Sequence, residues 1–139
     1  GVYQPDVFED KVYINGNVTY NKTEDANGFT LADSPEWLIT GGVTYEPTEW
    51  LVANLSGKYT GERYSTFVET AEVEAFTVFD GYVDLGGPNG FGVPENISLR
   101  FNLNNVFDER VPTAFMFAGS AFYRPLNPRT FQATLTARF

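Results

Sequence analysis

Closely spaced acidic side chains are the first candidates for chemistry in this sequence. Glu72 and Glu74 form one pair and Asp80 and Asp84 another, and paired carboxylates carry out general acid and base catalysis in glycosidases. The chain contains neither His nor Cys, which removes the commonest general base, the thiol nucleophile and the cysteine zinc site. Acidic pairs without such partners are expected in any acidic chain. We therefore predict no enzyme activity, no catalytic residue and no bound cofactor.

Two further patterns resemble binding sites for phosphate or metal. The run 86–92 is rich in Gly, but it lacks the GxGxxG and GK[ST] spacings that hold phosphates, so we interpret it as a tight turn. Asp6, Glu9 and Asp10 are carboxylates that could hold calcium weakly, but a solvated turn is the better explanation for them. The prediction is that the chain has no metal site.

Composition narrows the class of protein. The 139 residues carry a formal net charge of −9 with nine Lys and Arg, which excludes a nucleic-acid partner because clustered cations must neutralise the phosphates. Aromatic residues make up 17% of the chain, yet the mean hydropathy is −0.23. No apolar stretch approaches the ~18 residues of a membrane-spanning helix. A very aromatic chain without such a helix is typical of β-structure.

Apolar and polar residues alternate along six segments, each roughly ten residues long. From residue 129 to 139, for example, Phe131 and Leu135 share a face that is opposite to Gln132 and Thr134. Strands of this length are longer than the usual soluble strand and cross a bilayer when tilted. The predicted strands are 11–20, 37–45, 50–59, 76–85, 96–105 and 129–139.

The connections between these segments also alternate in length. Links 46–49 and 86–95 are short or rich in Gly and Pro, whereas links 21–36, 60–75 and 106–128 are longer. Short turns on one side and long loops on the other are typical of outer-membrane barrels. A soluble β-sandwich also alternates, but its dry core would not accept Lys58, Arg100 and Arg138 on the second face. The predicted fold is therefore all-β: an antiparallel transmembrane β-barrel segment.

Motifs in the last third of the chain sharpen this prediction. Residues 102–108 read Asn-Leu-Asn-Asn-Val-Phe-Asp, residues 123–125 Tyr-Arg-Pro and residues 128–131 Pro-Arg-Thr-Phe. With the aromatic Phe139, they resemble the C-terminal end of TonB-dependent outer-membrane receptors. In that family the penultimate strand ends in an Asn-Leu-Phe-Asp type motif, and the last strand opens with a Pro-Arg-Thr/Ser-Phe type motif and closes on an aromatic. Residues 34–37 and 76–80 resemble earlier parts of the same barrel.

The resemblance implies the rest of the architecture. Six strands cannot close a barrel, and open sheet edges are not stable in hydrocarbon. We therefore expect residues 1–139 to be an incomplete C-terminal part of a barrel domain, which the family implies has 22 strands and a plug that is absent from this chain. The implied partners are the remainder of the barrel and its plug, outer-membrane lipid and lipopolysaccharide, the TonB complex through the plug, and the barrel-assembly machinery.

Residues with expected roles fall into three groups. The family motif comprises Asn102, Asn105, Asp108, Pro128 and Arg129, of which Asn105 and Asp108 favour turns, and Arg129 is in phase with the lipid-facing side. The barrel-assembly signal comprises Phe131, Leu135 and Phe139. The long loops offer aromatic and Arg side chains that can hold a ligand: Arg63, Tyr64, Phe67, Phe115, Phe117, Tyr123 and Arg124.

The resemblance implies energised uptake of a scarce nutrient at the bacterial outer membrane. Ferric siderophores, cobalamin and oligosaccharides are the substrate classes of the family. Two alternatives remain at this point: a soluble extracellular β-sandwich that binds carbohydrate through aromatic platforms, and a passive porin that keeps the barrel without the plug. The sequence does not indicate which ligand is carried.

Overall fold

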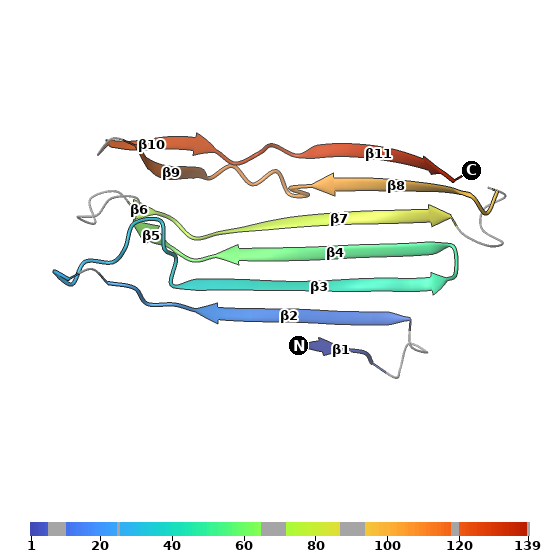
Figure 1. Ribbon diagram of the computed structural model, residues 1–139, viewed down its shortest axis with the longest axis horizontal. Helices are drawn as coiled ribbons and strands as arrows, with labels where there is room; N and C mark the ends of the chain where they lie inside the picture. The colour runs from blue at the N-terminus through green and yellow to red at the C-terminus, as the bar shows by residue number, and fades with distance from the viewer. Residues whose placement is uncertain (6–10, 25, 65–71, 87–93, 118–119, 139) are drawn as a thin grey trace.

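The computed structural model shows one main antiparallel sheet and two small hairpins (Figure 1). It describes residues 1–5, 11–24, 26–64, 72–86, 94–117 and 120–138, with the backbone alone at 112–117, 120, 121 and 123. The strands are β1 (Val2–Tyr3), β2 (Val12–Tyr20), β3 (Trp37–Thr48), β4 (Leu51–Thr60), β5 (Arg63–Tyr64), β6 (Glu72–Val73), β7 (Phe76–Gly86), β8 (Ile97–Asn104), β9 (Pro112–Phe117), β10 (Ser120–Pro125) and β11 (Thr130–Ala137).

The main sheet has the order β1-β2-β3-β4-β7-β8-β11. Its six long strands coincide with the six predicted segments, so the antiparallel all-β fold is confirmed. The short strand β1, which pairs with β2 through Val2 and Tyr3, was not predicted because two residues show no periodicity. Strand β3 also runs through Pro47 to Thr48, past a bulge after Tyr45. The predicted link 46–49 is therefore mostly strand, since a bulge accommodates the missing N–H of proline.

The two ends of the sheet differ, and Figure 1 shows both. We call the end that carries the described residues of 21–36, 61–64, 72–75, 105–117 and 120–129 the loop end, and the end at Glu49 and Trp50 the turn end. The hairpins β5–β6 and β9–β10 lie within the long connections and extend the loop end. The predicted long loops thus contain extra strand pairs. Residues 87–93, where a tight turn was predicted, lie outside the described residues.

Strand register places apolar and polar residues on opposite faces of the main sheet. One row of paired residues across the six long strands is apolar: Ile14, Val43, Leu55, Gly81, Leu103 and Phe131. The adjacent row carries polar groups: Tyr13, Thr44, Asn54, Tyr82, Asn102 and Gln132. Because side chains alternate along every strand, the sheet has one apolar face and one polar face, and we use these two names below.

The apolar face is not covered by protein. Among the described side chains, Val73 of β6 and Pro5 are the only buried apolar ones. Phe131 and Leu135 are 67% and 69% exposed. A sandwich would bury these residues between two packed sheets, so the soluble sandwich alternative is wrong. Within the part of the chain that the structure describes, no helix is long and apolar enough to cross a membrane.

Aromatic side chains gather near the loop end of the apolar face. The rings of Tyr20 and Trp37, which are paired across β2 and β3, lie 4.7 Å apart. Phe79 packs edge-on against Phe107 at 5.2 Å, and its ring closely covers Gly57 on the neighbouring strand. Aromatic rings at strand ends are the usual boundary between the hydrocarbon and the head groups.

Candidate functional site

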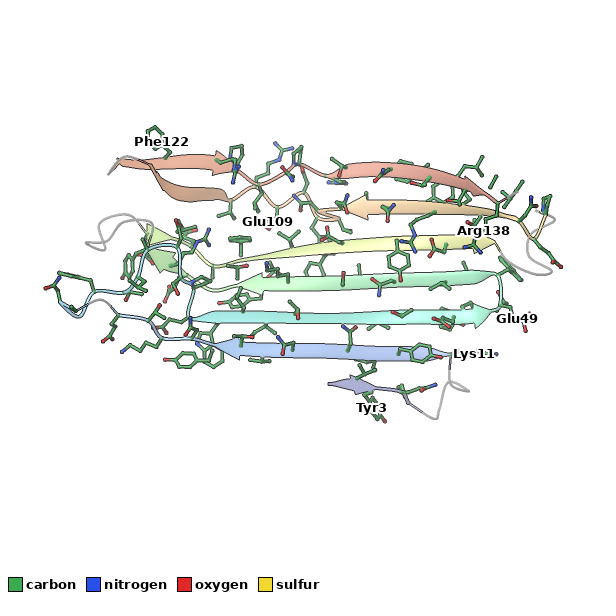
Figure 2. All side chains as sticks on the ribbon, viewed as in Figure 1. Tyr3, Lys11, Glu49, Glu109, Phe122 and Arg138 are labelled. Atoms are coloured by element: carbon green, nitrogen blue, oxygen red, sulfur yellow. The ribbon has the colours of Figure 1, made fainter. Side chains whose placement is uncertain are left out.

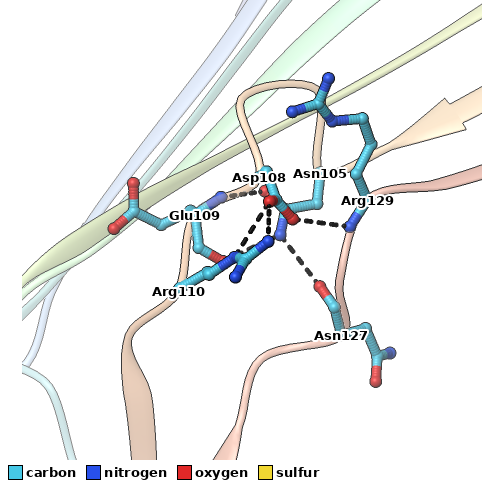
Figure 3. A network of polar contacts seen from close by, with 6 residues as sticks. All are labelled: Asn105, Asp108, Glu109, Arg110, Asn127 and Arg129. Carbon is cyan, nitrogen blue, oxygen red and sulfur yellow. Dashed lines mark hydrogen bonds and ion pairs between the residues drawn. The ribbon is translucent and has the colours of Figure 1, made fainter.

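A network of polar contacts fixes the place where the chain leaves β8 (Figure 3). Asn105 is 4% exposed and has a φ of 51°, a conformation that Asn tolerates better than most residues. Its Nδ2 donates to the carbonyls of Glu109 at 3.0 Å and Asn127 at 2.9 Å. Its Oδ1 accepts the backbone N–H of Glu109 at 2.7 Å. One side chain therefore ties together the two segments that enter and leave the β9–β10 hairpin.

Asp108 and Asp80 complete this network. The Asp108 carboxylate accepts hydrogen bonds from the Arg110 guanidinium, with Nε at 2.9 Å, and from the backbone N–H of Arg129 at 3.2 Å. The bonds to Arg110 and then to Arg129 lower the pKa of Asp108 below its ordinary value. Asp80 of β7 accepts the backbone N–H of Asn105 at 2.8 Å. The turn is thereby connected to three strands of the sheet.

A cleft of about 730 Å³ lies on the polar face at the loop end. We call it the basic cleft. Its walls come from the 21–36 connection, from β3, β4, β5 and β7, and from the segment around the end of β10. The lining side chains that bear on its chemistry are Asp33, Lys58, Thr60, Arg63, Phe76 and Arg124.

The charge of the basic cleft is opposite to that of the chain. The chain has 18 Asp and Glu against nine Lys and Arg, yet among the described residues the cleft is lined by Lys58, Arg63 and Arg124, with Asp33 as the one acid. Asn127, which is anchored by Asn105, also lines it. The polar network thus positions one wall of the cleft.

Arg63 has an unusual environment for a charged side chain. It is 10% exposed, and its Nε lies 3.8 Å from Oδ1 of Asp33, beyond hydrogen-bond distance. Its guanidinium carbon lies 5.8 Å from the centre of the Phe76 ring. Among the residues that the structure describes, its Nη1 is buried and has no hydrogen-bond partner. A buried guanidinium that lacks part of its hydrogen bonding is costly for the fold.

Arg100, on the same face toward the turn end, forms a two-pronged ion pair with a neighbouring carboxylate. It donates two hydrogen bonds to Asp84 on the adjacent strand, at 2.6 Å and 2.5 Å. It also lies 4.6 Å from the centre of the Tyr82 ring. A cavity of about 390 Å³ is lined there by Arg100, Asp84 and Arg138, among others. Glu49 and Arg138 mark this end of the sheet in Figure 2.

The predicted ligand-loop residues are distributed unevenly. Arg63 and Arg124 are brought together in the basic cleft, whereas Tyr64 lines a neighbouring cleft. Phe115, Phe117 and Tyr123 lie in β9 and β10, where the structure describes the backbone alone. Phe67 lies outside the described residues.

The other predicted residues are placed as follows. Phe131 and Leu135 of the assembly signal lie on the exposed apolar face, and Phe139 is outside the described residues. Asn102 lies on the polar face of β8. Pro128 and Arg129 precede β11, which starts at Thr130, one residue later than predicted.

Sequence reasoning missed three important members of the basic cleft. Lys58 was recognised as a polar-face residue, but its proximity to two arginines depends on the fold of the loops. Asp33 and Phe76 carried no signal, because their contact with Arg63 joins the 21–36 connection, β5 and β7. The buried state of Arg63 follows from the same long-range contacts.

No cluster of three or more potential metal-ligating side chains occurs among the described residues. Asp6, Glu9 and Asp10, the weak calcium candidates, lie in residues that the structure does not describe. The two members of the Asp80 and Asp84 pair have different partners: Asp84 binds Arg100, and Asp80 accepts the backbone N–H of Asn105.

Comparison with known proteins identifies the family. Residues 3–106 match the family described as "TonB dependent receptor-like, beta-barrel". The chain belongs to this family. The match contains most of the main sheet and the start of the Asn102–Asp108 motif, so the resemblance seen in the sequence is confirmed. No curated protein sequence matches the chain.

Solved receptor structures share the fold along almost the whole chain. The ferric citrate transporter FecA aligns with a TM-score of 0.84 and 19% identity, over 99% of this chain and 23% of FecA. The copper transporter OprC aligns with a TM-score of 0.75 and 18% identity, over 99% of this chain and 22% of OprC. The ferripyoverdine receptor of the outer membrane of Pseudomonas aeruginosa aligns with a TM-score of 0.70 and 17% identity, over 91% of this chain and 17% of the receptor. The chain therefore spans about a fifth of the length of these receptors.

Family membership settles the location and the general nature of the chain. It is part of a TonB-dependent receptor barrel in the bacterial outer membrane. The remaining strands of that barrel are its partners. The family consists of receptors and not of enzymes, in agreement with the prediction that the chain has no catalytic role.

Proposed function

We propose that the chain is a C-terminal section of the wall of an outer-membrane receptor that takes up a scarce nutrient with energy delivered by TonB. The family match over residues 3–106 carries this proposal. The plug and the contact with TonB would belong to other parts of the receptor. In this arrangement the apolar face contacts lipid and the polar face lines the lumen.

The loop end would face the outside of the cell, where a ligand first meets the receptor. In outer-membrane barrels the long loops are extracellular and the short turns are periplasmic. The basic cleft lies on the lumen side of this end. A ligand that enters from outside would therefore meet Lys58, Arg63 and Arg124 before it reaches the middle of the barrel.

The nutrient is proposed as a class. Proteins named for ferric citrate, ferripyoverdine and copper share the fold. Their sequence identity to this chain is too low to indicate its substrate. Ferric siderophores, cobalamin and oligosaccharides remain the substrate classes that we propose. The basic cleft favours an anionic member over an uncharged one, because cations in a cleft raise the local concentration of anions.

Uptake by cells that produce the full-length receptor tests this function. Cells with and without TonB would be supplied with a labelled ferric siderophore, cobalamin or a maltooligosaccharide. We expect one of these nutrients to enter only when both the receptor and TonB are present. Entry that needs the receptor but not TonB would contradict the proposal and support a passive porin.

A further inference from the structure

Arg63 is the most unusual buried charge in the described part of the chain. Its side chain is nine-tenths buried, its nearest acid is 3.8 Å away, and its Nη1 lacks a partner among the described residues. A guanidinium presents five donors in a planar fork that fits carboxylate and phosphate groups. An arginine buried in this way is prepared to bind an anion that is not part of the described structure.

Other cations accompany Arg63 in the same cleft. Lys58 comes from β4 and Arg124 from β10, and both line the basic cleft. Three of the nine Lys and Arg of the chain are therefore collected in one place, where Asp33 is the one acid in the described part of the lining. A chance distribution in a chain with twice as many acids as bases would give the opposite balance.

The charges around Arg63 also indicate the direction of approach. Arg63 lines a second cleft, where its neighbours include Glu24, Glu36, Glu62 and Glu72. An anion is repelled from that acidic side and attracted to the side of Lys58 and Arg124. Arg63, whose side chain keeps a tenth of its surface exposed, can thus be approached by an anion through the basic cleft.

We propose that Arg63, Lys58 and Arg124 form a subsite for the carboxylate or phosphate oxygens of a small, multiply charged anion. The inference rests on the proposed function, since it concerns the ligand that the receptor takes up. Arg63 contributes its positive charge and the part of its side chain that remains exposed, and the Phe76 ring lies 5.8 Å from its guanidinium carbon. Asp33 competes with the ligand for Arg63.

Calorimetric titration of the purified full-length receptor in detergent tests the subsite. Citrate and inorganic pyrophosphate serve as separate probes for carboxylate and phosphate, with sucrose as the uncharged control. We expect at least one anion to bind, and R63Q to weaken its binding at least about tenfold because a charged hydrogen-bonding partner is lost. R138Q makes the same change of charge at the turn end (Figure 2) and should alter binding less than about twofold.

D33N keeps the inference testable even where R63Q disturbs folding. Asp33 has a φ of 58°, which Asn adopts well, and the substitution removes the competing carboxylate. We expect the anion to bind several-fold more tightly, a gain that misfolding cannot produce. Absence of anion binding to the wild type, equal effects of R63Q and R138Q, or no gain with D33N would each overturn the subsite.

Two measurements distinguish failure of the subsite from failure of the proposed function. TonB-dependent uptake without Arg63-dependent anion binding would refute the subsite and leave the receptor function in place. Anion binding that depends on Arg63 with uptake that ignores TonB would do the reverse.

Discussion

Two arginines on the polar face, Arg63 at the loop end and Arg100 toward the turn end, have opposite environments. Arg100 donates two hydrogen bonds to Asp84 on the neighbouring strand and covers the Tyr82 ring. Arg63 is more buried, yet its nearest carboxylate is beyond hydrogen-bond distance. The difference indicates different uses of the same residue type: Arg100 holds two strands together, whereas Arg63 lines the basic cleft with its charge incompletely paired by the described residues.

The loop end has its own structural anchor, which is Asn105 and not an arginine. Asn105 links Glu109 to Asn127, and Asn127 lines the basic cleft. The wall of the cleft therefore depends on a neutral, buried amide. This separation of tasks suggests variants that affect stability, binding or both.

The largest effect is expected for N105A. The substitution removes three side-chain hydrogen bonds, at about 1 kcal/mol each, and leaves buried backbone groups without partners. We expect the unfolding free energy of the receptor in detergent to fall by about 3 kcal/mol. Anion binding should weaken as well, because Asn127 and the adjacent cleft wall lose their attachment.

N105G serves as the matched control for backbone conformation. Glycine accepts the φ of 51° without strain. N105G should therefore lose the same three hydrogen bonds as N105A but add no backbone strain. Stability of N105G equal to that of the wild type would contradict the role of the side chain.

R100Q and R63Q should separate stability from binding. R100Q breaks the pair with Asp84, and since both side chains are substantially exposed, we expect a loss of no more than about 1 kcal/mol in unfolding free energy. R63Q removes a buried charge that lacks part of its hydrogen bonding. The unfolding free energy of the R63Q receptor should therefore equal or exceed that of the wild type. Denaturant unfolding and anion titration of both variants check this. Loss of anion binding in R100Q together with loss of stability in R63Q would contradict the structural role of Arg100 and the binding role of Arg63.

The smallest effect concerns pH at the loop end. The pKa of Asp108 is lowered in the folded chain by Arg110 and Arg129. The ionised carboxylate therefore stabilises the fold above its ordinary pKa of 3.8, and this contribution disappears as the pH falls through the lowered value. We expect wild type to melt above D108N at pH 6 and the two melting temperatures to converge as the pH falls below 3.8 through the lowered pKa of Asp108. A difference that stays constant over this range would exclude Asp108 as the titrating group.

Much of the fold was predictable because strand periodicity is a local property. Alternation along 129–139 and 96–105 identified the partners β11 and β8, and residues such as Leu135 were assigned to the correct face. The bulge after Tyr45 and the short hairpins were not predicted, since they depend on pairing and not on pattern.

The site was predictable only in part. Arg63 and Arg124 were chosen as loop cations, but Lys58 and Asp33 join them only through contacts between segments distant in the sequence. The motif residues Asn105 and Asp108 were selected for their turn-forming chemistry, and both have positive φ in the structure. Which carbonyls Asn105 would bind could not be read from the sequence.

Site-directed spin labels directly test whether the apolar face of the sheet contacts lipid and the polar face lines the lumen. The chain has no Cys, so T134C and L135C place labels on adjacent residues with opposite predicted surroundings. In the full-length receptor in lipid vesicles, we predict that the label at 135 collides with oxygen dissolved in lipid and the label at 134 with a water-soluble nickel chelate. Equal exposure of both labels to the chelate would contradict the assignment of the apolar face to lipid and of the polar face to the lumen.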